Sequence, residues 1–292
     1  MSKFCAFILT HGRPDNVITY DTLRRQGYTG DIRLIIDNED ARGDEYRQRY
    51  GAEVIEFNKQ QVSDTMDEGD NFGDRRTIVY ARNVCWRIAK EHGYTAFIQL
   101  DDDYTEFRHK VGSRGQYIEG IPGQSVCQIR NLDAVFAAMT EFVRTTRFKT
   151  ICMGQGGDYL GGMDGDIWRR PKRKAMNSFV CLTDRPFQFV GRVNEDVSTY
   201  ALLGSRGDLF LTHMHIALQQ AQTQKNSGGM SEMYLDSGTY VKSFYSVMFN
   251  PSGVRISIIQ SKYPRIHHQV RWRYTTPKIL SVKSRKEELP KH

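Results

Sequence analysis

The sequence predicts an α/β fold with a mostly parallel sheet flanked by helices. Two observations support this: apolar strands alternate with helical patterns over the first hundred residues, and polar residues follow several of those strands. Such alternation builds a parallel sheet with helices on both faces, and right-handed crossovers bring the carboxyl ends of the strands to one edge. A chain of 292 residues allows one large domain, or one domain with a modest appendage.

The first half of the chain begins with an apolar run at 3–9, which predicts a core strand. Pro14-Asp15 then signals the start of a helix over 15–26. The same reasoning predicts strands at 32–36, 53–57 and 96–100, and helices at 44–50 and 77–92. The polar, acidic segment 60–74 is expected to form a surface loop or lid.

The second half is less regular. It predicts helices at 132–147 and 194–203 and strands at 151–153, 177–183, 208–212 and 254–259. The segment 154–165 is rich in glycine and aspartate, which indicates a mobile loop. Residues 219–233 are polar and indicate a loop or a frayed helix. We expect residues 1–240 to form one domain and 241–292 to form a basic, aromatic region packed on it.

The net charge of +7 is unevenly distributed. One basic block comprises Arg169, Arg170, Lys172, Arg173 and Lys174, and a second extends from Lys262 to Lys291. Such asymmetry favours a polyanionic partner, with a solvated basic face as the alternative.

The cysteines and the apolar runs bear on the compartment. Five cysteines are scattered without a Cys-x-x-Cys pair, which argues against a zinc site or a disulfide framework. No apolar run approaches the ~20 residues of a membrane helix. We therefore expect a cytoplasmic protein with no membrane partner.

Three carboxylates, Asp101, Asp102 and Asp103, directly follow the strand at 96–100. Open α/β sheets bind ligands at the carboxyl ends of their strands. Two unit charges ~4 Å apart repel by roughly 4 kcal/mol at an effective dielectric of 20, so a divalent cation such as Mg²⁺ or Mn²⁺ is the simplest compensation. In an extended segment, Asp101 and Asp103 would point the same way. The alternative is a solvated acidic turn.

Other polar residues are predicted at the same edge. Asp37 ends the second strand, where a carboxylate can bind a ribose or a base, although a turn aspartate is equally compatible. Thr10 and Arg13 follow the first strand in a turn that is weak evidence alone. Arg75 and Arg82 lie just before or on the helix that leads to the acidic strand, where arginines can neutralise a diphosphate. Exposed helix arginines are the alternative.

Glu195 and Asp196 begin a predicted helix, where acidic residues often only complement the helix dipole. Here the pair is a candidate source of a general base. His213 and His215 flank Met214 after a strand and share a face, so either is a candidate metal ligand. His267 and His268 form a second candidate pair.

In their order along the chain, these features resemble a known family. A Thr-x-x-Arg-Pro turn is followed by Asp37, then Ala81-Arg82-Asn83, the acidic triplet, Asn194-Glu195-Asp196 and a later histidine. This order resembles the GT-A fold glycosyltransferases, over roughly residues 3–215. Within that fold the chain is similar to the phage branch of the TET-associated glycosyltransferases, which modify 5-hydroxymethylated pyrimidines in DNA.

The resemblance implies a Rossmann-like GT-A domain over 1–240, with a basic C-terminal extension. It implies that Asp103 holds Mn²⁺ or Mg²⁺ with His213 or His215, and that Asp101, with Asp102 beside it, contacts the donor, most simply a UDP-sugar. Asp37 would recognise the nucleoside, and Arg82 would lie near the nucleotide or the sugar. Asp196 would be the base, with Glu195 as its neighbour.

The expected acceptor is double-stranded phage DNA with hydroxymethylated bases, in the host cytoplasm. Its phosphates would meet the first basic block and, in the C-terminal region, Arg265, His267, His268, Arg271 and Arg273. Two alternatives stay open: the same fold acting on a saccharide or protein hydroxyl, and a non-catalytic nucleic-acid-binding module.

Overall fold

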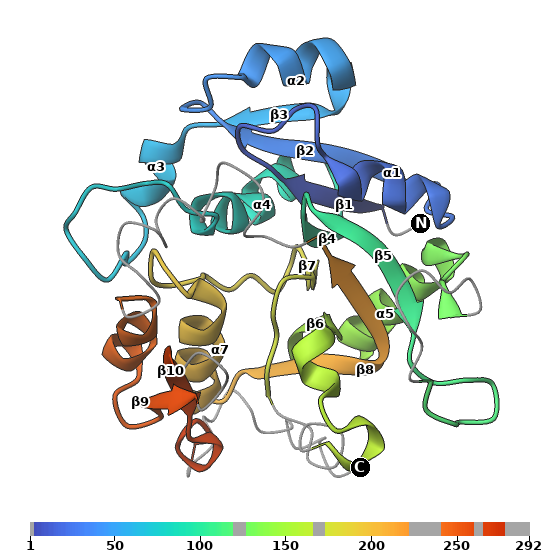
Figure 1. Cartoon of the computed structure of the whole chain (residues 1–292). Helices are drawn as coiled ribbons and strands as arrows, with labels where there is room; N and C mark the ends of the chain where they lie inside the picture. The colour runs from blue at the N-terminus through green and yellow to red at the C-terminus, as the bar shows by residue number, and fades with distance from the viewer. Residues whose placement is uncertain (1–2, 119–126, 166–172, 222–240, 260–264, 278–292) are drawn as a thin grey trace, which may run out of the picture.

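The structure is a computed structural model that describes residues 3–118, 127–165, 173–221, 241–259 and 265–277. Its centre is an eight-stranded sheet with the order β3-β2-β1-β4-β7-β6-β8-β5 (Figure 1). The strands are β1 (Phe4–Leu9), β2 (Asp31–Asp37), β3 (Val54–Phe57), β4 (Ala96–Asp101), β5 (Tyr104–His109), β6 (Phe148–Gly154), β7 (Phe179–Leu182) and β8 (Leu209–Gln220). A separate antiparallel pair joins β9 (Val254–Ile259) to β10 (Arg265–Val270).

The predicted α/β class is confirmed, because the sheet is mostly parallel. β1 pairs in parallel with β2 and β4, β2 with β3, and β6 with β8. Only β7 and β5 run antiparallel to their neighbours. The carboxyl ends of β1 to β4 therefore share one edge, as the crossover argument predicts.

Helices cover the sheet. They are α1 (Ile18–Arg25), α2 (Gly43–Tyr50), α3 (Lys59–Ser63), α4 (Val79–Glu91), α5 (Leu132–Thr145) and α7 (Glu195–Ser205). Residues 241–249 are also helical. Successive strand residues face opposite sides, so in β1 Phe7 packs toward α4 and α7, whereas Ile8 packs toward α1 and α5. Both faces of the sheet are buried, as expected for parallel strands.

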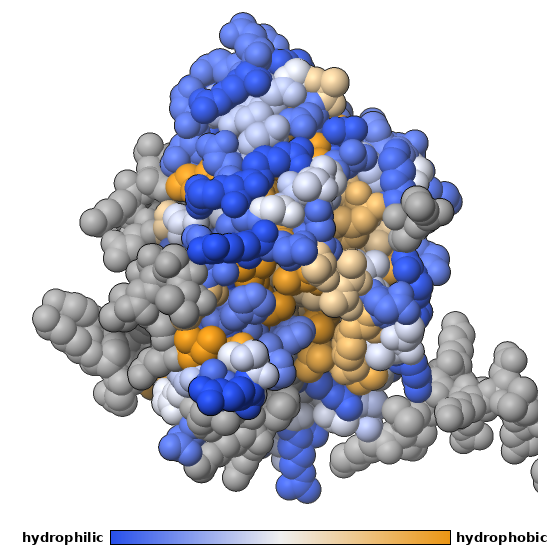
Figure 2. All heavy atoms as spheres, turned by 90° about the vertical axis from the view of Figure 1, so that its right-hand side faces the viewer, coloured by the Kyte–Doolittle hydropathy of each residue, from blue (hydrophilic) through white to orange (hydrophobic). Residues whose placement is uncertain are grey.

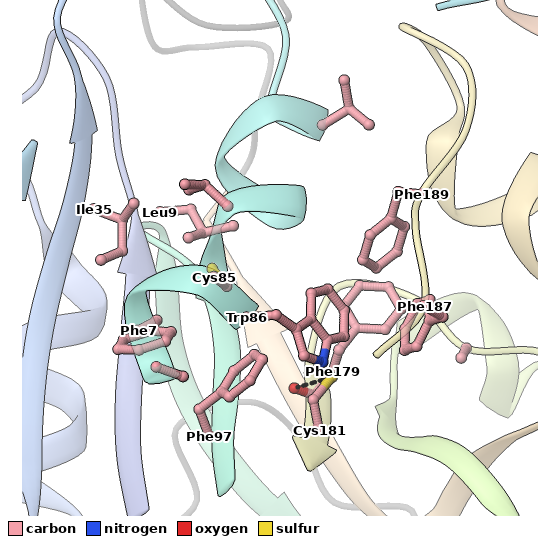
Figure 3. Packing of buried hydrophobic residues seen from close by; sticks show 14 of the residues in the cluster. Phe7, Leu9, Ile35, Cys85, Trp86, Phe97, Phe179, Cys181, Phe187 and Phe189 are labelled. Carbon is pink, nitrogen blue, oxygen red and sulfur yellow. Dashed lines mark hydrogen bonds between the residues drawn. The ribbon is translucent and has the colours of Figure 1, made fainter. Parts of the chain in front are cut away.

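An aromatic cluster fills the core on the α4 side (Figure 3). The Trp86 ring lies edge-on to Phe97 at 5.3 Å and to Phe187 at 4.8 Å between ring centroids. Its indole Nε1 donates to the Leu182 carbonyl at 3.3 Å (Figure 3). This packing fixes α4 over β4 and β7.

Four parts of the fold differ from the sequence prediction. The strand β5 was not predicted, and β8 extends eight residues beyond the predicted end at 212. β8 bulges between His213 and Ala217, which pair with the consecutive residues Met153 and Gly154 of β6. The first helix begins at Ile18 rather than at 15. The segment 154–165 forms two short 3-10 turns. The Tyr159 hydroxyl, in the first turn, donates to the Met214 and Ile216 carbonyls of β8. Of the polar segment 219–233, the part from residue 222 lies outside the described residues.

The surface over the β5 edge is shown in Figure 2, where hydrophilic residues dominate the upper part and hydrophobic residues gather toward the middle. Among the helices that the structure describes, none combines the length and the apolar character needed to cross a bilayer.

Candidate active site

A cavity of about 400 Å³ opens at the carboxyl ends of β1, β2 and β3. Its apolar lining comes from the sheet and from the start of α4, and includes Leu9, Ile35, Phe57, Ile78 and Ala81. Its polar lining comprises Thr10, His11, Gly12, Arg13, Asp37, Glu39, Lys59, Arg75, Arg76 and Thr77. An apolar floor with a cationic rim suits a ligand that combines a flat ring with an anionic group.

Asp37 lies in this cavity, and both of its oxygens have partners. His11 Nδ1 lies 2.8 Å from Oδ2, and Lys59 Nζ lies 2.9 Å from Oδ1. Burial would raise the pKa of Asp37, but the His11 hydrogen bond and the Lys59 charge together lower it. The Asp37 hydrogen bond raises the pKa of His11. Sequence reasoning missed both partners, although Lys59 follows the end of a predicted strand and could have been found there.

The three acidic residues form a turn between β4 and β5, and each takes a different partner. Asp101 Oδ1 lies 3.0 Å from Arg82 Nη2. Asp102 lies 2.8 Å from Arg13 Nη2 and accepts from Thr10 Oγ1 at 2.6 Å. Asp103 accepts from Gln220 Nε2 at 3.3 Å. The chain turns at 102–103, so the extended geometry expected for Asp101 and Asp103 is wrong.

Burial raises the pKa of Asp101 and of Asp102 to about 6 each, against the opposing charges of Arg82 and Arg13. Burial and the Asp102 charge also raise the pKa of Asp103. The turn therefore concentrates negative charge that its own arginines only partly offset, and a bound cation would stabilise it further.

Arg82 links this turn to α7. Its guanidinium is 2% exposed; Nε donates to Glu195 Oε1 at 2.9 Å, and Nη2 donates to Asp101. The guanidinium carbon lies 4.9 Å from the centroid of the Phe179 ring, which supports it by a cation–π contact. Nη1 is buried and has no hydrogen-bond partner among the described residues. A buried donor without a partner is costly, so this atom is a candidate contact for a ligand.

Asn194 precedes α7 in a left-handed conformation with φ 59°. Its side-chain amide donates to Ser246 Oγ at 2.5 Å and lies 3.2 Å from His268 Nδ1. Burial raises the pKa of Glu195, and the neighbouring Asp196 adds to the effect. Asp196 Oδ1 accepts the Val197 backbone N–H at 2.7 Å. The structure therefore brings His268 to Asn194, the residue before Glu195, and the sequence did not predict this contact.

The structure does not bring His213 and His215 to the acidic turn. They lie seven and five residues before Gln220, the residue of β8 that contacts Asp103. At ~3.3 Å per strand residue this separation is roughly 15 Å or more. They lie against β6 and the bulge instead, so neither is retained as a ligand of a metal at Asp103.

The basic residues proposed for DNA are only partly visible. Arg169, Arg170 and Lys172 lie outside the described residues, as does the side chain of Arg265. Lys174 forms an ion pair with Asp158, and the Arg271 guanidinium lies 4.4 Å from the centroid of the Tyr274 ring. Burial, with the charges of His267, Lys242 and Lys174, lowers the pKa of His268 to about 3, so its imidazole is neutral. Arg75 pairs with Glu39 at 2.6 Å on the cavity rim.

The carboxylate oxygens of the acidic turn fit a metal ion that takes most of its other ligands from a substrate and from water. Within the described ranges there is no group of three or more His, Cys, Asp or Glu residues that could hold an ion alone. Mg²⁺ commonly binds through one or two carboxylates and takes phosphate oxygens and water as its other ligands. The carboxylates of the acidic turn are oxygen donors of this kind, and a diphosphate would complete the coordination of a metal held there.

The cavity, the acidic turn and the buried arginine lie at the carboxyl ends of the strands, where open α/β sheets bind their ligands. The model of the TET-associated glycosyltransferases matches residues 4–229 of the chain. The chain therefore belongs to the TET-associated glycosyltransferase family, and the resemblance inferred from its motifs is confirmed.

Solved structures similar to this chain include two of glucosyl-3-phosphoglycerate synthase from Mycobacterium tuberculosis. The complex with Mg²⁺ and UDP is 10% identical, with a TM-score of 0.47, and the match covers 92% of this chain and 88% of that one. The complex with Mn²⁺, UDP and phosphoglyceric acid is also 10% identical, with a TM-score of 0.46 and coverage of 92% and 87%. A sequence search of characterised proteins finds no match.

Proposed function

We propose that this enzyme transfers a sugar from a UDP-sugar to the hydroxyl of a 5-hydroxymethylated pyrimidine in phage DNA, with the help of a divalent metal. The membership of the TET-associated glycosyltransferase family supports the reaction class. The observation that carries the proposal is the Arg82 bridge, because one buried side chain connects Asp101 of the acidic turn to Glu195 at the start of α7.

The cavity is the proposed binding site for the donor nucleoside. Its apolar floor fits a flat base, and Asp37, held between His11 and Lys59, would fix the polar edge of the nucleoside. Arg13 and Arg76 line the same cavity. Their charges would attract the diphosphate.

The acidic turn would then face the diphosphate. Asp103, with Asp101 beside it, would hold Mg²⁺ or Mn²⁺, which when bound stabilises the negative charge of the departing nucleoside diphosphate. Arg82 would orient Asp101 and offer its buried Nη1 to the donor. Preorganised charges of this kind stabilise a transition state without reorganising during the reaction.

Asp196 is the proposed base that takes the proton of the acceptor hydroxyl. Glu195 Oε1 already accepts a hydrogen bond from Arg82, so this oxygen is engaged in the core and not directed to an acceptor. Asp196 has no arginine partner among the ion pairs of the described residues. Asp196 lies at the start of α7, next to Asn194, and it is not among the residues that line the cavity, which suits a group that acts on the acceptor rather than on the nucleoside.

DNA is the proposed acceptor because basic residues lie near His268 and in the segment after β10. Lys174 and Lys242 are close enough to lower the pKa of His268, and Arg271 and Arg273 follow β10. Contacts with phosphates would make DNA affinity fall steeply as salt rises.

The test incubates the protein with Mn²⁺, a panel of UDP-sugars and matched duplexes that contain either 5-hydroxymethylcytosine or cytosine. Mass spectrometry of the digested nucleosides then reads the product. A hexose or pentose added only to the hydroxymethylated duplex is expected. Transfer to a saccharide or peptide hydroxyl but not to DNA would contradict the proposed acceptor, and absence of any donor turnover would contradict the proposed enzyme.

A further inference from the structure

The loop between α3 and α4 presents Phe72 to solvent. Its ring is 76% exposed, the highest exposure among the aromatic side chains that the structure describes as exposed. Leaving so much apolar surface in water has no benefit for folding. An aromatic side chain that a loop holds in water is available to contact a ligand.

This loop is firmly anchored. Asp70 Oδ1 accepts the Phe72 backbone N–H at 3.0 Å, and Asp70 Oδ2 accepts from Arg192 Nε at 2.9 Å. The Tyr245 hydroxyl also bonds to Asp70. Backbone N–H groups of Gly191 and Arg192 donate to the Asp67 and Glu68 carbonyls. The exposed ring therefore sits on a fixed base.

The packing below the loop is equally close. Gly69 and Gly191 both have positive φ, and a Cβ added to either would lie 3.0 Å or 2.8 Å from the Phe249 ring. Only glycine allows these two segments to approach the helix at 241–249 so closely. Figure 1 shows this helix, in orange-brown, below the teal loop that leads to α4.

Phe72 is connected to segments that contribute to both halves of the proposed site. Three residues later, Arg75 begins the segment that lines the nucleoside cavity. On the other side, the Arg192 guanidinium carbon lies 5.8 Å from the centroid of the Phe72 ring, and two residues later Asn194 opens the helix that carries Glu195 and Asp196. An arginine beneath an aromatic ring forms a cationic platform against which a flat, electron-rich group can stack.

We propose that Phe72 is the stacking residue for the acceptor nucleobase of DNA. This inference rests on the proposed function and adds to it how the base is held. A base in a duplex must leave its stack before its hydroxymethyl group can reach a buried carboxylate. Phe72 would replace the lost stacking, and the positive groups near His268 would hold the flanking phosphates.

The test compares Phe72→Ala, Phe72→Leu and Phe72→Trp with the neighbouring control Asn71→Ala, using the hydroxymethylcytosine duplex. Stacking on an aromatic contributes roughly 1–3 kcal/mol per base, which corresponds to an increase of about 5- to 150-fold in KM for DNA. We expect that increase for Phe72→Ala and Phe72→Leu, with KM for the donor unchanged. Phe72→Trp and Asn71→Ala should behave like the wild type.

The outcomes separate the two proposals. If the wild type modifies the duplex and Phe72→Ala does so with the same KM for DNA, the assignment of Phe72 is overturned and the proposed function stands. If Phe72→Leu matches the wild type, the ring acts by bulk and stacking is overturned. If the wild type transfers no sugar to DNA, the proposed function fails and Phe72 fails with it.

Discussion

Arg82 and Glu195 lie 113 residues apart in the chain, yet their side chains share a 2.9 Å hydrogen bond in the core. The same guanidinium pairs with Asp101, so α4, β4 and α7 meet at a single buried cation. Removing one member of a buried ion pair leaves an uncompensated charge. The mutual position of the acidic turn and the helix of the proposed base therefore depends on this arginine.

The first prediction concerns stability. Arg82→Met should lower the free energy of unfolding by about 3–5 kcal/mol, because two buried carboxylates lose their partner. Urea denaturation measures the loss. The control is Arg87→Met on the same helix, where the side chain is 52% exposed and its pair with Glu91 is a surface pair, with an expected cost below about 1 kcal/mol. An Arg82 variant as stable as this control would show that the bridge is not structural.

The second prediction concerns the acidic turn. Asp103→Asn should abolish sugar transfer and leave the melting temperature unchanged or slightly higher, since burial and Asp102 disfavour the charged form of Asp103. Transfer assays with Mn²⁺, together with thermal denaturation in EDTA, check both parts. Asp44→Asn, on an exposed side chain of α2, is the control. Full turnover by the Asp103 variant would rule out this residue as a metal ligand.

The third prediction separates the two carboxylates of α7. Asp196→Asn should remove transfer while UDP binding, measured by calorimetry, stays as in the wild type. Glu195→Gln should reduce transfer less, because a glutamine oxygen can still accept the hydrogen bond from Arg82. The reverse order of activities would assign the base role to Glu195.

The fourth prediction concerns pH. The pKa of His11 is higher in the folded protein than in the unfolded chain. The ion pair of His11 with Asp37 therefore stabilises the folded protein fully at pH values below the ordinary histidine pKa near 6.5, and this stabilisation is lost as the pH rises through the raised pKa. The pKa of Asp37 is lowered in the folded protein. The stabilisation that this carboxylate contributes is therefore present above about pH 4 and is lost as the pH falls through the lowered pKa.

His11→Gln should therefore destabilise the protein more at pH 5.5 than at pH 8.5. The side chain of His11 is 45% exposed, so solvent screening limits the difference to about 1 kcal/mol or less. Denaturation of both proteins at the two pH values measures it. An equal effect at both values would mean that the imidazole is neutral in the folded protein.

The parallel part of the sheet could be predicted because its signals are local. Strands such as β1 and β4 are short apolar runs bounded by polar residues, and their order places Asp37 and Asp101 at one edge. The strand β5 could not be predicted in this way. Its buried residues include Glu106 and Arg108, which lie 3.6 Å apart as an ion pair, so the strand shows no apolar alternation.

Which side chains contact one another in the candidate site depends on tertiary structure, and the sequence alone does not show it. Lys59 reaches Asp37 because β2 and β3 pair with Asp37 opposite Phe57, and that register is not encoded in either segment alone. The two histidines of β8 show that a suitable local spacing does not guarantee a place in the site. His213 and His215 have the right spacing to share a strand face, but the length of β8 beyond them separates them from Asp103.

The contact of Gly69 and Gly191 with Phe249 has a consequence for shortened versions of this protein. A chain truncated before residue 241 would lose the ring that fills this gap, the Tyr245 hydroxyl on Asp70 and the Ser246 partner of Asn194. Residues 241–249 thus hold the loop that carries Phe72 and the start of α7 in place. Deleting them should inactivate the enzyme even where the proposed nucleoside cavity stays intact.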